Sequence, residues 1–218
     1  PYAEVKSGYT SFFLGVRSIV PNATMDVKFT SSWYDEAAEN TTAKALIERG
    51  CKLISQHADS MGAPNACKEK GIPNVTYNVS TEKDCEGSYV IGSRINWAPY
   101  YKYIVEATIK NETIPYDWTG TLQSDSVQLL EIGKAAAAGT AEKLATVKAA
   151  LENGTLNVFD TNNFTVGGKH ITTFLADVDD AGDFVPETEV VENGILKESA
   201  FRSAPYFTLD IDGITVLK

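Results

Sequence analysis

The chain has 218 residues, 43% of them hydrophobic, so it can bury a substantial core in one large or two small domains. Its formal charge of −10 argues against nucleic-acid partners, because proteins that bind phosphate backbones gather Lys and Arg on one face. No apolar run approaches the roughly 20 residues of a membrane span, and Glu4, Lys6 and Arg17 interrupt any signal peptide, so we expect a soluble chain.

Helices and strands alternate in the first part of the chain. Helical spacing of apolar residues predicts a helix over residues 2–19, and alternation predicts a strand over 25–33. Acidic residues at its start and Gly50 just past its end predict a helix over 35–50. A strand over 51–57, a short helix over 60–71 closed by Gly71 and a strand over 74–79 follow. This order predicts an α/β fold with parallel strands and right-handed crossovers.

The pattern changes towards the end of the chain. A strand is predicted over 88–96, and a helix over 97–111 carries Ile104, Val105, Thr108 and Ile109 on its apolar face. An extended segment over 121–132 and a helix over 140–154 follow. Alternating runs around Gly167-Gly168 and around Asp212-Gly213 then predict two β-hairpins in a β-rich tail.

The three cysteines are Cys51, Cys67 and Cys85. They lack the close CxxC spacing of a zinc or redox site, and at most one intramolecular disulfide is possible. We expect Cys51 and Cys67 to be small packing residues and Cys85 to be exposed.

Polar clusters follow three of the predicted strands, at residues 31–35, 56–60 and 77–80. Ligands of parallel α/β sheets bind outside the carboxyl ends of the strands, so we expect these three loops to converge at one edge. Asp35 and Ser60 also stand at helix starts, where they are expected to be N-caps.

These clusters contain the side chains of a small-molecule site. A planar heterocycle can stack on Trp33, and Gln56, Asp59 and Asn78 can form hydrogen bonds with a polyol. The alternative for Trp33 is a structural role as a core or rim aromatic.

Enzyme chemistry has little support in the sequence. His57 beside Asp59 is typical of a hydrolase base and its orienting acid, but no Gly-x-Ser-x-Gly elbow or other activated nucleophile accompanies them. His170 lies far along the chain without a ligand-spacing motif, so no metal site is predicted. The P-loop and the dinucleotide glycine fingerprint are both absent, so we predict no cofactor and no catalytic residues.

Four stretches together resemble one known family. "GVRS" at 15–18, "SSWYDEAAE" at 31–39, "QHADS" at 56–60 and "NWAPYY" at 96–101 are similar to the basic membrane protein family of substrate-binding lipoproteins, which serve nucleoside ABC importers. The resemblance runs from about residue 8 to residue 154. It implies a type I periplasmic-binding-protein-like fold, in which a parallel sheet is flanked by helices and two α/β lobes close on the ligand.

The resemblance also implies a domain organisation. Residues 1–120 correspond to the second ligand-binding lobe, 121–157 to the segment that returns to the first lobe, and 158–218 to a β-hairpin extension. The family's opening Asp/Asn/aromatic stretch, which grips the base, has no match here. We therefore expect that the first lobe is absent from this chain.

By position, Trp33 matches the family's aromatic residue that stacks on the ligand. Asn78 stands where many nucleoside-binding members have the Asp that holds the ribose hydroxyls, and an amide lacks the charge-assisted strength of that carboxylate. We therefore predict that Trp33 stacks on the ligand and that Gln56, His57, Asp59 and Asn78 form hydrogen bonds with it.

The implied function is that of an extracytoplasmic solute-binding component of an ABC importer. It would bind a small polar ligand such as a nucleoside and deliver it to an ABC permease, with membrane attachment only through a lipid anchor preceding this chain. The alternative is a ligand sensor or interaction module whose C-terminal tail contacts a partner protein.

Overall fold

The computed structural model describes residues 2–179 and 184–218 and divides into two compact units. Unit 1 consists of Pro1–Val27, Tyr116–Thr119 and Gly154–Lys218, and unit 2 of Lys28–Pro115 and Gly120–Asn153. The fold is mixed α/β, as predicted. The lobe ranges predicted from the family resemblance stay a prediction.

Unit 2 is built on a sheet whose strand order is β2-β3-β4-β5. β2 (Ile54–Ser55), β3 (Asn74–Tyr77) and β4 (Tyr89–Ile95) are parallel, and β5 (Val127–Leu129) is antiparallel to β4. The helices of this unit are α2 (Glu36–Glu48), α3 (Gly62–Lys70), α4 (Glu82–Cys85), α5 (Ala98–Ile109) and α6 (Thr140–Glu152). The predicted parallel strands with intervening helices are confirmed.

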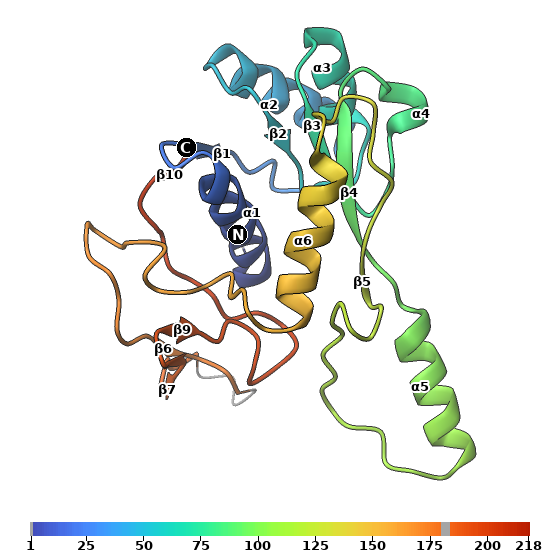
Figure 1. The fold of residues 1–218 in the computed structure, drawn as a ribbon, viewed down its shortest axis with the longest axis vertical. Helices are drawn as coiled ribbons and strands as arrows, with labels where there is room; N and C mark the ends of the chain where they lie inside the picture. The colour runs from blue at the N-terminus through green and yellow to red at the C-terminus, as the bar shows by residue number, and fades with distance from the viewer. Residues whose placement is uncertain (1, 180–183) are drawn as a thin grey trace. The chain divides into compact units, whose positions relative to one another are not determined.

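Helices α2 and α3 lie side by side (Figure 1). Their close approach depends on Gly62, because a Cβ at this position would overlap the backbone of Glu36 and lie 2.8 Å from the Asn40 nitrogen. The Asn40 side-chain amide also donates to the Gly62 carbonyl at 3.0 Å. As predicted, α3 ends at Gly71, which has a left-handed backbone with φ 65°.

Helix α5 follows β4 and extends beyond the end of the sheet (Figure 1). The apolar face predicted for this helix is only partly covered: Ile104 is half-buried, whereas Val105 and Ile109 are exposed. Trp97 and Tyr101, which lie at i−8 and i−4 from Val105, are also more than half exposed. The helix therefore has two apolar sides: the one with Ile104 is partly buried, and the one with Trp97, Tyr101 and Val105 is exposed.

Unit 1 combines the first helix with the tail. α1 (Ala3–Ile19) and β1 (Met25–Val27) precede unit 2 in the chain, and β10 (Ile214–Val216) follows it. β1 and β10 form a two-stranded parallel sheet, with Met25 opposite Ile214. The remaining tail strands form two short antiparallel pairs, β6 (Leu175–Ala176) with β7 (Thr188–Glu189) and β8 (Val191–Glu192) with β9 (Ile195–Leu196).

The core of unit 1 is aromatic. Phe13 and Leu14 of α1 pack with Phe159, Phe164 and Phe207 of the tail, and all five side chains are buried. The rings of Phe159 and Phe207 lie 4.9 Å apart. Nearly all of the partners that bury the apolar face of α1 are thus tail residues far away in the sequence.

The two predicted tail hairpins have different outcomes. Val166 and Lys169 exchange backbone hydrogen bonds around Gly167 and Gly168, both at positive φ, so the first turn is confirmed although its flanks form only an isolated bridge. The second hairpin prediction is wrong, because β10 pairs in parallel with β1 instead of folding back on residues 206–211.

Burial and the Asp212 carboxylate explain that error. Phe207 and Ile211, which would form the first strand of the second hairpin, are buried in the core of unit 1. The carboxylate of Asp212 accepts hydrogen bonds from the Thr165 hydroxyl and from the backbone N–H of Gly168, which lower its pKa. The Asp212-Gly213 turn is therefore fixed to the first turn of the tail.

The three cysteines are thiols that take part in no disulfide bond. The prediction that Cys85 is exposed is wrong, since Cys85 and Cys67 are both fully buried, and Cys51 is half-buried. Burial, with a smaller contribution from Cys85, raises the pKa of Cys67 to about 12.

Within residues 2–179 and 184–218, no helix is both long and apolar enough to cross a membrane.

Candidate functional site at the carboxyl edge of the sheet

Three aromatic rings lie in a row where β2 and β3 end. The Trp33 and His57 rings have centroids 5.9 Å apart, and the His57 and Tyr77 rings are 4.8 Å apart. His57 follows β2, and Tyr77 is the last residue of β3. We call these three residues the aromatic row. It brings together the three polar clusters found in the sequence, as expected for the carboxyl edge of a parallel sheet.

Trp33 reaches this edge by a different route from the one predicted. The strand expected over 25–33 ends at Val27, and it pairs with β10 in unit 1 instead of joining the sheet of unit 2. Trp33 lies in the irregular segment that precedes α2. Its carbonyl accepts a hydrogen bond from the Asp59 N–H at 2.8 Å, which ties the first loop to the second.

A buried carboxylate that the sequence reasoning missed reinforces this tie. Glu39 of α2 is 3% exposed, and its two oxygens accept from the backbone N–H groups of Asp35 at 3.0 Å and Ser60 at 3.2 Å. Asp35 in turn caps α2 by accepting from the Ala38 N–H, as predicted. A Glu four residues after an N-cap Asp is the sequence signal for the local half of this contact, one position later than the Glu of a capping box.

Ser60 and Gln56 shape the second loop. The hydroxyl of Ser60 accepts from the Gly62 N–H at 3.0 Å at the start of α3. The amide nitrogen of Gln56 donates to the carbonyls of Ala58 and Ser60, and its oxygen accepts from the Asn74 amide. The polar atoms of Gln56 are thus engaged in fixing the loop that carries His57 and Asp59.

Asn78 is clamped to the neighbouring strand. Its backbone is left-handed, with φ 64°, and its N–H donates to the Ser93 carbonyl at 2.7 Å. Its side-chain oxygen accepts from the Ile95 N–H at 3.2 Å. Asn tolerates this backbone conformation better than most residues. Asn78 and Asp59 are both exposed at the surface.

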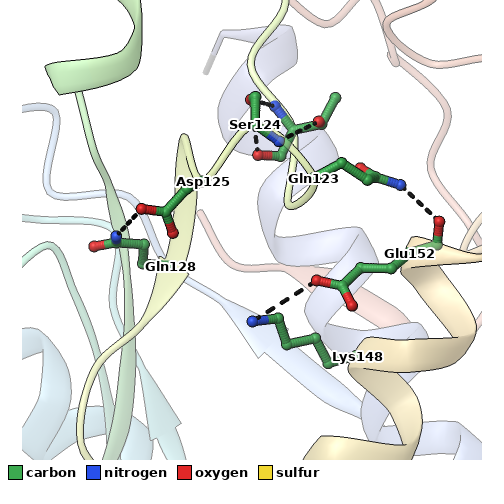
Figure 2. Close-up of polar contacts among 7 residues, drawn as sticks. Gln123, Ser124, Asp125, Gln128, Lys148 and Glu152 are labelled. Atoms are coloured by element: carbon green, nitrogen blue, oxygen red, sulfur yellow. Dashed lines mark hydrogen bonds and ion pairs between the residues drawn. The ribbon is translucent and has the colours of Figure 1, made fainter.

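Further along this edge, polar side chains form hydrogen bonds with neighbouring protein groups. In Figure 2, the Gln123 amide donates to the Glu152 carbonyl at 2.8 Å, and the Gln128 amide donates to Asp125 at 2.9 Å. The Asp125 carbonyl also accepts from the Asn96 amide at 2.9 Å. These contacts fasten the segment before β5 both to the end of α6 and to the end of β4.

Glu131, which follows β5, accepts a hydrogen bond from the Ser80 hydroxyl, and this bond lowers the pKa of the Glu131 carboxyl. Across the described ranges, no group of three or more His, Cys, Asp or Glu side chains is placed to hold a metal ion. The arrangement of rings, amides and an exposed carboxylate suits the binding of a small planar or polar molecule.

The structure thus brings the predicted site residues Trp33, Gln56, His57, Asp59 and Asn78 to one edge, although their contact with a ligand stays a prediction. Tyr77 stood in one of the polar clusters but was not predicted as a site residue. Its position directly before Asn78 at a strand end was the available signal.

Comparison with known proteins identifies relatives for most of the chain. The sequence model of the Bmp family, described as ABC transporter substrate-binding protein PnrA-like, matches residues 1–158. A purine-binding protein of Brucella abortus is 32% identical over 124 residues, which are 55% of this chain and 35% of that protein. A Haloferax volcanii protein provisionally named ABC transporter glucose-binding protein is 26% identical over 159 residues, which are 73% of this chain and 41% of that protein.

Weaker relationships add a receptor and a solved structure. A metabotropic glutamate receptor-like protein of Dictyostelium discoideum is 25% identical over 58% of this chain and 17% of that protein. The solved structure of an ABC transporter solute-binding protein from Conexibacter woesei superposes with a TM-score of 0.53 at 20% identity, covering 66% of this chain and 49% of that one. The chain therefore spans less than half the length of these relatives, and the structural match concerns the fold.

Proposed function

Because this chain belongs to the Bmp family of PnrA-like ABC transporter substrate-binding proteins, we propose that it is part of an extracytoplasmic solute receptor that delivers a purine-type ligand to an ABC permease. The ligand is a purine nucleoside or its base. The receptor is held at the cell membrane by a lipid anchor, and it performs no catalysis.

The observation that carries the proposal is the aromatic row of Trp33, His57 and Tyr77 at the carboxyl edge of the sheet. Aromatic faces stack on nucleobases with about 1–3 kcal/mol per base. Asp59 and Asn78, which are both exposed and lie within two residues of His57 and Tyr77 in the chain, supply hydrogen bonds. The Brucella relative, a purine-binding protein, supports this ligand class.

The name of the Haloferax relative favours glucose as a second candidate ligand. Sugars also use aromatic platforms with surrounding polar groups, so the two ligands must be compared directly. Titration of the chain with inosine, hypoxanthine and glucose, followed by backbone amide NMR shifts, separates them. We expect shifts at residues 33, 57 and 77–78 with the purines and none with glucose.

Trp33→Ala tests the role of the aromatic row, with Trp97→Ala as its matched control. Both tryptophans are about half exposed, and both lie in unit 2. Loss of one stacking contact lowers purine affinity roughly tenfold in Trp33→Ala, whereas Trp97→Ala keeps the wild-type affinity. If Trp33→Ala binds purines as the wild type does, the site assignment is wrong.

The alternative function, a ligand sensor whose tail contacts a partner, has some support from the receptor-like relative in Dictyostelium. Deleting the tail cannot test this alternative, because tail residues bury Phe13 and Leu14. Substituting the exposed tail residues Leu175 and Phe201 by Ser avoids that damage. Ligand uptake that continues while a cellular response to the ligand is lost would favour the sensor.

A further inference from the structure

Two contacts bring the Cys85 thiol of α4 against α3, the helix that carries Cys67. The Cys85 Sγ lies 3.9 Å from the Asn65 Oδ1 in α3. The Lys68 ammonium donates to the Asp84 carbonyl at 2.6 Å. Asn65 and Lys68 lie on either side of Cys67 in the sequence of α3, so α4 packs beside the turn of α3 that contains Cys67.

Backbone hydrogen bonds place both cysteines at the same edge of the sheet. The Cys67 carbonyl accepts from the Ile72 N–H at 3.0 Å, shortly before β3 begins at Asn74. The Asn74 N–H donates to the Ser88 carbonyl at 2.7 Å, and the Ser88 N–H donates to the Cys85 carbonyl at 2.9 Å. The two cysteines thus lie where β3 and β4 begin, whereas the aromatic row lies where β2 and β3 end.

Burial makes both thiols unreactive in the folded, reduced chain. Both side chains are fully buried, and burial raises the pKa of each thiol. The charge of Cys85 adds to the rise at Cys67, and a like charge has this effect only when it lies nearby. Because the thiolate is the reactive form, a reaction between the two thiols has to take place while the chain folds and they are still exposed.

We propose that Cys67 and Cys85 form a disulfide bond when the chain folds in the presence of a small-molecule disulfide as oxidant. One thiolate attacks the oxidant and releases a first small thiol, and the other thiolate then attacks the mixed disulfide and releases a second one. The two protein thiols thereby lose two protons and two electrons, and the oxidant takes them up. Proteins that fold outside the cytoplasm meet such oxidants.

The bond joins α3 to α4 across the whole of β3. A disulfide stabilises a fold mainly by restricting the unfolded chain, and the segment between Cys67 and Cys85 includes all of β3. Because the bond lies at the opposite edge of the sheet from the aromatic row, it leaves the geometry of the row unchanged. Burial of both sulfur atoms also shields the bond from reductants once the chain has folded.

The test refolds the full chain from urea, once with reduced and oxidised glutathione and once with a phosphine reductant. Free thiols are then alkylated, and trypsin places the three cysteines on different peptides because lysines lie between them. Mass spectrometry of the glutathione sample should show an alkylated Cys51 and a linked pair of peptides that contains Cys67 and Cys85. The thermal midpoint of this sample should lie roughly 5–10 °C above that of the reduced sample.

Cys51→Ala is the matched control, because it removes one of the three thiols but leaves the proposed pair intact. It should give the same linked peptides and the same difference in thermal midpoint as the wild type, whereas Cys85→Ala should give neither. If Cys85→Ala does not fold, the peptide map of the wild type decides.

Three alkylated cysteines in the glutathione sample overturn the proposal, and so does a linked pair that contains Cys51. If the linked and the reduced chains unfold at the same temperature, the bond does not stabilise the native fold and its proposed role is wrong. The peptide map requires no ligand, so its result does not depend on whether the chain binds a purine.

Discussion

Unit 1 and the carboxyl edge of unit 2 are each stabilised internally by a different kind of contact. Unit 1 has a core of large aromatic side chains, such as Phe13, Phe159 and Phe207. The edge of unit 2 is organised by a buried carboxylate and by amides that accept and donate to loop backbone. The stability of unit 1 therefore depends on the burial of apolar side chains. The geometry of the candidate site depends on polar contacts, which a few substitutions can remove.

The largest expected effect is the loss of an aromatic side chain from the core of unit 1. Phe207 is fully buried, so Phe207→Ala should lower the free energy of unfolding of this unit by about 3–5 kcal/mol. Amide hydrogen exchange resolved by residue is the measurement: protection should fall in unit 1, with unit 2 unchanged.

Phe201→Ala is the control for this substitution, because Phe201 is 53% exposed. It should cost less than about 1 kcal/mol. Equal losses of protection in both units after Phe207→Ala would mean that the two units unfold as one, and the comparison between them would break down.

The second prediction concerns the edge. Glu39→Ala leaves the N–H groups of Asp35 and Ser60 without their acceptor, at a cost of about 2–3 kcal/mol in unit 2. Purine affinity should fall as well, since the loops bearing Trp33 and Asp59 lose a shared anchor. Urea denaturation and NMR titration measure the two effects. If purine affinity is retained, the hydrogen bond from the Asp59 N–H to the Trp33 carbonyl is sufficient to hold the two loops in place.

The contact between α2 and α3 gives a third prediction. Gly62→Ala places a methyl group against the backbone of α2, and this overpacking should cost about 1–3 kcal/mol. Gly87→Ala is the matched control, because a Cβ at Gly87 meets nothing within 4 Å. Thermal unfolding of the two variants should therefore differ by several degrees. Equal melting temperatures would mean that α2 and α3 separate easily.

The smallest expected effect is a dependence of stability on alkaline pH. The pKa of Cys67 is raised by burial from 9.0 to about 12, so its stabilising contribution is complete below pH 9 and is lost as the pH rises towards 12. The free energy of unfolding should fall by up to about 1.4 kcal/mol per pH unit in this window. Urea titrations measure this change: between pH 8 and pH 10, the free energy of unfolding should decrease less in Cys67→Ala than in Cys51→Ala.

The sequence predicted the parts of the fold that local signals determine. Acidic residues early in α2 and Gly71 after α3 indicated helix ends close to those observed. The order of parallel strands was enough to predict that the loops bearing His57 and Tyr77 converge, whereas Trp33 joins them although its predicted strand pairs in unit 1. Each of these signals lies within a few residues of the feature that it determines.

Contacts between distant residues were beyond sequence reasoning. The parallel pairing of β1 with β10 joins segments almost 190 residues apart, and the alternating pattern around Asp212-Gly213 favoured a local hairpin instead. Cys85 lies among charged residues in the sequence, yet the fold buries it completely. The contact between Glu39 and Ser60 depends on how α2 packs beside the second loop, which no spacing rule predicts.

The pairing of β1 with β10 also bears on how the chain is made. The tail residues that cover Phe13 and Leu14 emerge from the ribosome from Phe159 onwards, and the partner strand of β1 emerges nearly 190 residues after β1 itself. At about 5–20 residues per second, this delay is on the order of 10–40 seconds. During this time the apolar face of α1 lacks its tail partners, and unit 2, which ends at Asn153, is completed before β10 emerges. We therefore expect nascent chains to need a chaperone at α1, and expression at lower temperature to improve the yield of folded protein.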